Sequence, residues 1–133
     1  MKHYLLDTNV CVYFLRNRYG VAQHIAAVGW ENCCISEITV AELLYGAESS
    51  NDAERNSRLV EDLCNHIEVV PLRDVLRTYA REKTRLRRNG TCIDDLDLFI
   101  GSTAKAYSYI LVTENLRHLN RIESIQIENW IER

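Results

Sequence analysis

Short apolar runs that end in polar residues recur along the chain, and they predict strands that alternate with helices. The first run covers residues 4–6, and it is followed by Asp7-Thr8-Asn9 and a mainly apolar stretch. An apolar run this short, bounded by polar residues, is typical of a buried strand. Further buried strands are predicted at residues 33–35, 67–70 and 109–112. The predicted helices cover residues 9–18, 21–28, 36–48, a polar segment that becomes apolar near 59–63, 72–89 and 98–107.

This alternation predicts an α/β fold in three layers, with a mostly parallel central sheet between two layers of helices. At 133 residues the chain has the size of one domain, so we expect a single domain over residues 1–133. No apolar run approaches the roughly 18 residues that a membrane helix needs. Asp7 and Asn9 also interrupt any signal-peptide pattern. We therefore expect a cytoplasmic protein with no membrane contact.

The cysteines, the histidines and the net charge exclude some kinds of site. The five Cys are scattered without a C-x-x-C pair, and the four His are equally dispersed, so a zinc site is not expected. Adjacent Cys33 and Cys34 would point to opposite faces of a strand, so they are not expected to share a ligand. Scattered cysteines in a cytosolic protein are usually reduced, apolar side chains. The net charge of −3 gives no overall attraction to nucleic acid. A nucleic-acid partner would need a local basic patch or bound cations.

Carboxylates follow the first and the last predicted strand. Asp7 stands directly after residues 4–6, and Glu114 follows the strand at 109–112 and Thr113. In open α/β sheets, ligands bind outside the carboxyl ends of the strands, so both acids are candidates for a site there. A purely structural role is the alternative for Asp7, because Asp, Thr and Asn are all good helix N-caps.

Glu42 is a carboxylate on a predicted helix face that looks inward. At about 100° per residue it falls among Ile38, Ala41 and Tyr45. A buried glutamate is costly unless it is paired or binds a cation. The alternative is that Glu42 lies at the edge of the apolar stripe and reaches water.

Asp97 is a second such carboxylate, in the helix predicted to follow residues 93–97. It shares a face with Ile100, Gly101 and Ala104, whereas Asp95 points roughly to the opposite side. Asp94, one turn earlier, is either a helix N-cap or an additional ligand. Acids in a first helical turn are also favoured by the helix dipole, which accounts for one or two of them without any function.

If these four acidic positions converge at one sheet edge, a divalent cation would offset their repulsion, since packed carboxylates raise one another's pKa. Oxygen ligands without His or Cys favour Mg²⁺ or Mn²⁺ over zinc. Such an ion can lower the pKa of a bound water and stabilise the charge on a transferring phosphoryl group.

The predicted helix at 72–89 has two distinct faces, an apolar one and one with an arginine stripe. The apolar face consists of Leu72, Val75, Leu76, Tyr79 and Leu86. The members of the arginine stripe recur at spacings of four, four, four and three, and they are Arg73, Arg77, Arg81, Arg85 and Arg88. Such a stripe is usually a solvated face, here partly neutralised by Asp74 and Glu82. The alternatives are a phosphate-binding ridge and a docking face for an acidic partner.

These motifs together resemble PIN domains. The resemblance rests on Asp7-Thr8-Asn9 after a strand, Glu42 in a helix, and the segment Asp97-Leu98-Phe99-Ile100-Gly101-Ser102-Thr103-Ala104. The ending is similar specifically to VapC toxins of VapBC toxin–antitoxin modules, through Leu111-Val112-Thr113-Glu114-Asn115, Arg117-His118-Leu119 and Trp130. The similarity covers essentially the whole chain, in order.

The resemblance implies a three-layer PIN-like domain that cuts RNA with Mg²⁺, or with Mn²⁺ as a substitute. It implies that Asp7, Glu42 and Asp97 are the acidic catalytic residues and metal ligands. Thr8, Asn9 and Thr113 would position the first ligand and the substrate. It also implies a VapB-like antitoxin, and a homodimer or a toxin–antitoxin hetero-oligomer. The first helix (Val10, Tyr13, Phe14) and the region of Tyr45 are the expected surface for the antitoxin helix.

The chain departs from the family pattern at the fourth metal position. VapC proteins usually have Thr-Asn-Asn where this chain has Thr113-Glu114-Asn115. Asn115 is the aligned residue, and Glu114 either supplies the fourth acid itself or faces solvent. Gly101 stands where Ala is more usual, and Leu119 where Phe is.

Two other functions compete with a nuclease. A catalytically silent PIN fold that binds RNA or protein would be expected to have lost an acid, and all three main acids are present. A response-regulator-like receiver also gathers acids at a sheet edge to hold Mg²⁺. It would need an acceptor Asp after a central strand and a late Lys, whereas the strand at 67–70 runs into Pro71 and the last strand into Thr113.

Overall fold

The structure is a computed structural model that describes residues 2–133. Strands and helices alternate along the chain, as the apolar pattern predicts. In order, the elements are β1 (Tyr4–Leu6), α1 (Thr8–Leu15), α2 (Val21–Val28), the 3₁₀ turn η1 (Trp30–Asn32), β2 (Cys33–Ser36), α3 (Glu37–Glu48), α4 (Ala53–His66), β3 (Glu68–Val70), the 3₁₀ turn η2 (Arg73–Val75), α5 (Leu76–Arg88), α6 (Asp95–Tyr107), β4 (Ile110–Val112), α7 (Leu116–Leu119) and β5 (Gln126–Glu128).

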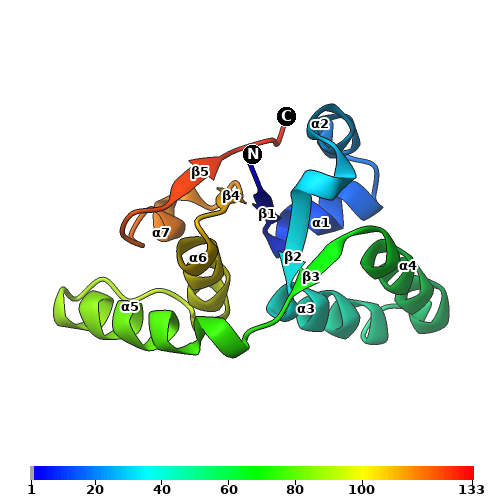
Figure 1. The fold of residues 1–133 in the computed structure, drawn as a ribbon. Helices are drawn as coiled ribbons and strands as arrows, with labels where there is room; N and C mark the ends of the chain where they lie inside the picture. The colour runs from blue at the N-terminus through cyan, green and yellow to red at the C-terminus, as the bar shows by residue number, and fades with distance from the viewer. Residues whose placement is uncertain (1) are drawn as a thin grey trace.

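The five strands form one sheet in the order β3-β2-β1-β4-β5, and every pairing is parallel (Figure 1). The chain first adds strands on one side of β1 and then crosses to the other side with β4. The strand order therefore reverses at β1 and β4, and the crevice at the carboxyl ends of such a pair is where open α/β sheets bind ligands. Residues that follow β1 and β4 meet at this point.

Two apolar cores fill the space on either side of the sheet, because successive strand residues point to opposite faces. Tyr4 and Leu6 pack in the core covered by α1–α4, whereas Leu5 packs in the core covered by α5–α7. Cys33 and Cys34 divide between the two cores in the same way. The sheet thus lies between two helical layers (Figure 1), which confirms the predicted three-layer α/β fold. All five Cys are free thiols.

Helix α3 buries a different face from the predicted one. Its buried residues are Thr39, Leu43 and Ala47, whereas Tyr45 is 75% exposed. Apolar residues surround most of this helix, so their spacing alone does not identify the packed face. Thr39 fits inside because its hydroxyl lies 3.1 Å from that of Thr8. The prediction that Ile38, Ala41 and Tyr45 form the inner stripe was therefore wrong.

Two other elements differ from the prediction. The helix expected over residues 72–89 begins with the separate turn η2 after Pro71, and Leu76, expected on its apolar face, is 52% exposed. Strand β5 was not predicted, although the apolar alternation of Ile125 and Ile127 was visible. It is a three-residue edge strand that pairs only with β4, and so short an alternation carries little signal.

Over residues 2–133, none of the helices combines the length and the apolar character that crossing a membrane would require.

Candidate active site

Asp7 is buried at the point where the strand order reverses. The residue is only 5% exposed, and its backbone N–H donates to the carbonyl of Val112 in β4 at 2.9 Å. Thr113 donates its hydroxyl to Oδ2 of Asp7 at 2.7 Å, and the backbone N–H of Thr8 donates to Oδ1 at 2.8 Å. Burial raises the pKa of Asp7, and these two hydrogen bonds oppose that rise. Asp7 is thus both the N-cap of α1 and a buried carboxylate at the sheet edge.

Thr8 links Asp7 to Glu42. The Thr8 hydroxyl donates to Oε1 of Glu42 at 2.6 Å, while its backbone N–H binds Asp7. Thr39, one turn before Glu42 on α3, lies within hydrogen-bond distance of the same hydroxyl. Because β1 and β2 are paired neighbours, the helices that follow them start side by side, and this brings Glu42 to Asp7. Glu42 is half-buried, at the edge of the packed face of α3.

Asp97 is the third carboxylate of the site, in the first turn of α6. Its pKa is raised to about 6, mainly by burial and then by the charges of Asp7, Asp94 and Glu42 in that order, while His118 acts in the opposite direction. Asp97 is therefore within electrostatic range of both other acids. Residues 97, 100, 101 and 104 share the packed side of α6, as their spacing predicts.

The two other aspartates of this segment have different surroundings. Asp94 is the N-cap of α6, accepting from the backbone N–H of Leu96 at 3.1 Å. Asp95 is exposed and turned toward α5, where it accepts from Lys83 and from the hydroxyl of Tyr79. This matches the expectation that Asp95 points away from Asp97.

Asn115 and Glu114 follow the same strand but point to different partners. The Asn115 amide lies 3.4 Å from Oδ2 of Asp97. Glu114 instead accepts hydrogen bonds from Tyr13 at 2.6 Å and Arg133 at 2.8 Å, and these partners lower its pKa. Asn115 therefore lies at the acidic cluster, beside Asp97, whereas the carboxylate of Glu114 is bound by Tyr13 and Arg133.

Asn9 and His118 also lie at this edge of the sheet. Asn9 is exposed on the first turn of α1. His118, on α7, has Nδ1 at 3.2 Å from Oδ1 of Asn115, and its charge acts on Asp97. His118 belongs to the VapC-like segment Arg117-His118-Leu119, but the sequence predicted no role for it at this site. Its position one helical turn after Asn115 was the available signal.

The donor set at this edge suits a hard divalent cation, because it consists of carboxylate and amide oxygens. The charges of Asp7 and Glu42 both act on the carboxyl of Asp97 and raise its pKa, whereas His118 lowers it. As the side chains stand in residues 2–133, no group of three His, Cys, Asp or Glu residues is arranged around one point that could hold an ion. Ligation by all three acids would therefore require side-chain adjustment.

A groove of about 580 Å³ opens beside the acidic cluster, between α1, α3 and α4. Its wall is apolar along Val12, Leu15, Leu43 and Leu59, and Glu42 also lines it. Arg16, Arg18 and Arg55 lie at its rim. The surface expected from the sequence was different: Val10 is fully buried in the core, and Phe14 packs against Trp30. The open side of α1 is the one that carries Val12 and Leu15.

Known proteins share both this sequence pattern and this fold. The PIN domain family matches residues 4–124. The tRNA(fMet)-specific endonuclease VapC of Salmonella typhimurium is 34% identical over 98% of this chain and 99% of its own length. Ribonuclease VapC2 of Haemophilus influenzae is 33% identical over 98% of this chain and its own full length.

Solved structures agree with these sequence matches. The crystal structure of DNA-bound VapBC from Salmonella typhimurium superposes with a TM-score of 0.91 at 33% identity, covering 98% of this chain and 99% of that chain. The structure of VapBC2 from Rickettsia felis bound to a promoter DNA fragment gives a TM-score of 0.88 at 31% identity, covering 96% and 98%. The chain belongs to the PIN domain family, among its VapC ribonucleases.

Proposed function

We propose that this chain is the endoribonuclease toxin of a VapBC-type toxin–antitoxin pair, and that it cuts RNA at the acidic cluster with the help of Mg²⁺ or Mn²⁺. The observation that carries the proposal is the crowding of carboxylates around Asp97. Burial and the charges of Asp7, Asp94 and Glu42 raise the pKa of this carboxyl to about 6. Crowded acids of this kind are typical of sites that bind cations. The relatives named as ribonuclease and endonuclease VapC support the same reaction class.

Asp7, Glu42 and Asp97 would hold the metal, with Asn115 as an additional oxygen donor. When bound, the ion supplies an activated water and stabilises the charge that develops on the phosphate. The chain's own contribution is to fix the ligands before the reaction. Thr113 and Thr8 hold both oxygens of Asp7, and the Thr8 hydroxyl orients Glu42. Hydrogen-bonded neighbours of this kind fix the rotamers of metal ligands and support their affinity.

The proposed partner is an antitoxin whose amphipathic segment lies in the groove between α1, α3 and α4. Solved relatives from Salmonella typhimurium and Rickettsia felis are VapBC complexes. The apolar wall of the groove would bind one face of a helix. Because Glu42 is one of the residues that line the groove, a basic side chain of the partner could reach the carboxylates and compete with the metal. Arginine suits this role because its planar guanidinium binds carboxylates bidentately.

One observation favours the alternative, a catalytically silent PIN fold that binds RNA or protein. Within residues 2–133 the acids are not arranged as a ready ligand set for one ion. A silent module would keep the fold and the groove, but it would bind Mn²⁺ no better than an ordinary acidic surface.

The test is RNA cleavage by the purified chain without its partner. We expect cleavage of total RNA in Mg²⁺ or Mn²⁺, none in EDTA, and recovery when the metal is returned.

Isothermal calorimetry should also detect Mn²⁺ binding that Asp7→Asn abolishes. Expression of the chain alone should stop growth, and the product of the adjacent reading frame should relieve that effect. Absence of both Mn²⁺ binding and cleavage, in a protein that is folded by circular dichroism, would leave the silent module as the answer.

A further inference from the structure

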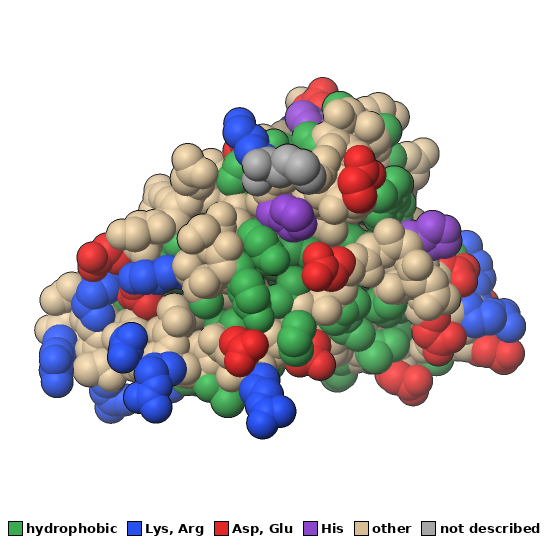
Figure 2. Space-filling view, viewed as in Figure 1, with side chains coloured by type: hydrophobic (Ala, Val, Ile, Leu, Met, Phe, Trp, Pro, Cys, Tyr) green, Lys and Arg blue, Asp and Glu red, His purple; other side chains and the backbone are tan. Residues whose placement is uncertain are grey.

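Helix α5 carries a dense positive charge on an acidic protein. Residues 73–88 contain seven basic and two acidic side chains, although the whole chain has a net charge of −3. Figure 2 shows the basic side chains gathered at the end of the molecule that α5 occupies in Figure 1. The acidic cluster and the groove of α1, α3 and α4 do not account for this charge.

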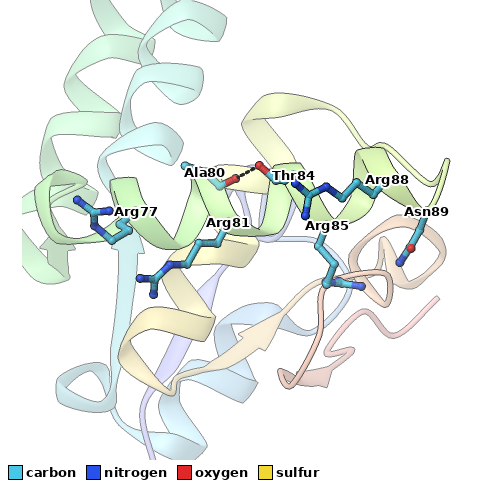
Figure 3. Close-up of a pocket in the computed structure, with 7 residues that line it drawn as sticks. All are labelled: Arg77, Ala80, Arg81, Thr84, Arg85, Arg88 and Asn89. Carbon is cyan, nitrogen blue, oxygen red and sulfur yellow. Dashed lines mark hydrogen bonds between the residues drawn. The ribbon is translucent and has the colours of Figure 1, made fainter.

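Five of these arginines, Arg73, Arg77, Arg81, Arg87 and Arg88, take part in no ion pair within residues 2–133, and three of the five line one depression of the surface. These three are Arg77, Arg81 and Arg88, and all of them are exposed. Figure 3 shows their side chains extending from the outer side of α5. We call these three residues the arginine ridge.

Arg85 belongs to a different environment, although its sequence spacing places it in the same stripe. It binds Glu82 at 2.9 Å and Glu123 at 3.3 Å, and it donates to the carbonyl of Arg121 at 2.7 Å. Glu82 is only 3% exposed and also binds Lys105. This buried cluster fixes α5 against α6 and the segment after α7. The structure thus separates a structural arginine from three with no such role.

The surface between the ridge side chains is a shallow depression of about 450 Å³. Its floor is formed by Ala80 and Thr84, and the Thr84 hydroxyl is already bound to the carbonyl of Ala80 at 2.8 Å. Eleven residues separate Arg77 from Arg88, which corresponds to roughly 16 Å along the helix axis. Three guanidinium groups over this length suit a chain of phosphates better than a single small anion.

The same face is poorly suited to a protein partner. Protein interfaces are centred on buried aromatic or large apolar side chains, with charges at the rim. Here the residues that line the depression besides the arginines are Ala80, Thr84 and Asn89, none of them aromatic or large and apolar. The groove of α1, α3 and α4 has an apolar wall, and it lies at the opposite end of the molecule from α5 (Figure 1).

Helix α5 is connected to the acidic cluster through its neighbour α6. The ring of Tyr79, which lies between Arg77 and Arg81 in sequence, stacks on Phe99 with centroids 3.8 Å apart. The Tyr79 hydroxyl donates to Asp95 at 3.0 Å. Asp95 and Phe99 flank Asp97 on α6. An RNA strand that follows the ridge toward Arg77 therefore approaches the outer side of the turn of α6 whose inner side carries Asp97.

We infer that the arginine ridge of Arg77, Arg81 and Arg88 binds the phosphate backbone of the RNA substrate, and so holds it across α5 while the acidic cluster acts on a distant phosphodiester. The inference rests on the proposed RNA cleavage. It adds a binding surface outside the carboxylate site, one that contacts phosphates and does not select base sequence.

The test compares two variants that lose the same positive charge. Arg77→Gln/Arg81→Gln removes two ridge arginines. Lys2→Gln/Arg58→Gln removes two exposed charges elsewhere, of which Arg58 has only an exposed pair with Glu54. The probe is a fluorescein-labelled 20-nucleotide RNA stem–loop, titrated by anisotropy in EDTA, where metal-dependent cleavage cannot occur. We expect the ridge variant to weaken binding about tenfold and to flatten the dependence of log Kd on log salt by roughly one to two units. The control variant should bind as the wild type does.

Cleavage kinetics in Mg²⁺ give the second measurement. The ridge variant should raise KM several-fold and leave kcat unchanged, because it contacts RNA away from the reacting phosphate. Equal losses of RNA affinity in the ridge variant and the control variant, or no loss in either, would overturn the inference. So would normal RNA affinity in a ridge variant that no longer binds the co-expressed partner protein, since the ridge would then be a protein-docking face.

The two proposals fail in different ways. If the wild-type chain cuts RNA and the ridge variant is unchanged in Kd and KM, the ridge inference is wrong and the nuclease stands. If the wild-type chain binds the stem–loop through the ridge but cuts no RNA in Mg²⁺ or Mn²⁺, the ridge stands as an RNA-binding surface and the nuclease is wrong.

Discussion

The hydroxyl of Thr113 donates a 2.7 Å hydrogen bond to Oδ2 of Asp7, joining residues 106 positions apart at the carboxyl ends of β4 and β1. Both side chains are buried. This bond opposes the effect of burial on the pKa of Asp7, so it favours the ionised form that would bind a cation.

Thr113→Val should therefore weaken the site, and it also removes the hydroxyl that accepts from the backbone N–H of Asn115 at 3.0 Å. We expect a 10- to 100-fold loss of cleavage, the range typical of a residue that supports a metal ligand. The free energy of unfolding should fall by about 1–2 kcal/mol, because one oxygen of a buried carboxylate loses its donor. Steady-state cleavage and urea unfolding measure the two effects.

Thr103→Val is the matched control for that substitution. Thr103 is equally buried, but its hydroxyl donates to the carbonyl of Phe99 at 2.8 Å, within α6. It should retain wild-type cleavage. Equal losses of activity in the two variants would show that the Thr113–Asp7 bond has no special part in the reaction.

The crowding of Asp97 predicts a pH-dependent difference in stability between the wild type and Asp97→Asn. The folded-state pKa is about 6, above the ordinary value of 3.8, so the bound proton favours the folded state. This contribution is present below about pH 4 and is lost as the pH rises through about 6. In EDTA, Asp97→Asn should match the wild type near pH 4. It should exceed the wild type by roughly 1 kcal/mol at pH 7, a discounted value because solvent screens the half-buried charge.

Urea unfolding of both proteins at several pH values measures this difference directly. Taking the difference removes the contributions of other groups, such as Glu114, whose pKa is lowered. A difference that is independent of pH, or that favours the wild type at pH 7, would contradict the described crowding.

Substitution of Glu82 on α5 should destabilise the protein more than substitution of an exposed acid. Its side chain is 3% exposed and binds both Arg85 and Lys105. Glu82→Gln leaves two basic groups beside a neutral amide, and removing one partner of a buried ion pair typically costs about 3–5 kcal/mol. Glu123→Gln, which removes the exposed partner of Arg85, should change stability by less than about 1 kcal/mol. Thermal unfolding of the two variants distinguishes them, and similar Tm values would contradict the role given to Glu82.

Gly101 is packed so closely that an added methyl group meets a specific atom. A Cβ at this position would lie 2.0 Å from Cδ1 of Ile122 and 3.2 Å from Leu119. Gly101→Ala should therefore destabilise the protein by about 1–2 kcal/mol despite the better helix propensity of Ala. Gly101→Ala/Ile122→Val removes the clashing atom and should recover most of that loss.

Gly46→Ala provides the comparison for this pair. Gly46 is also within a helix, but nothing lies within 4 Å of its added Cβ, so stability should rise by about 0.5–1 kcal/mol. Urea unfolding of all three variants tests the packing. A stabilising Gly101→Ala, or a double variant no better than the single one, would show that the space around Ile122 is larger than described.

The sequence was informative wherever a pattern followed from local geometry. Alternation of strand faces placed Cys33 and Cys34 on opposite sides of the sheet. Helical spacing separated Asp97 from Asp95, and polar residues after short strands marked the edge at which Asp7 and Thr113 meet. Each of these inferences needs only the repeat of one strand or helix and the parallel order of the sheet.

The failures occurred where a tertiary contact decided the outcome. Apolar side chains surround α3, so only packing against its neighbours determines that Thr39 is buried and Tyr45 exposed. Spacing placed Arg85 with the exposed arginines, but Glu82, one turn earlier on α5, and Glu123, beyond α7, both bind it. Strand β5 exists because β4 offers it an edge, and its three residues are too few to signal that on their own.

The most direct test of the account is RNA cleavage in Mg²⁺ by Asp97→Asn beside Asp95→Asn. The two aspartates lie in the same first turn of α6, but Asp97 faces Asp7 and Glu42, whereas Asp95 binds Lys83 and Tyr79 on the outside. Both variants should fold, and both change the net charge equally. The account predicts that Asp97→Asn reduces cleavage at least 1,000-fold, roughly the loss expected when a group essential to metal catalysis is removed, while Asp95→Asn cuts RNA at the wild-type rate. Cleavage by Asp97→Asn at the wild-type rate, in a preparation free of contaminating nuclease, would contradict it.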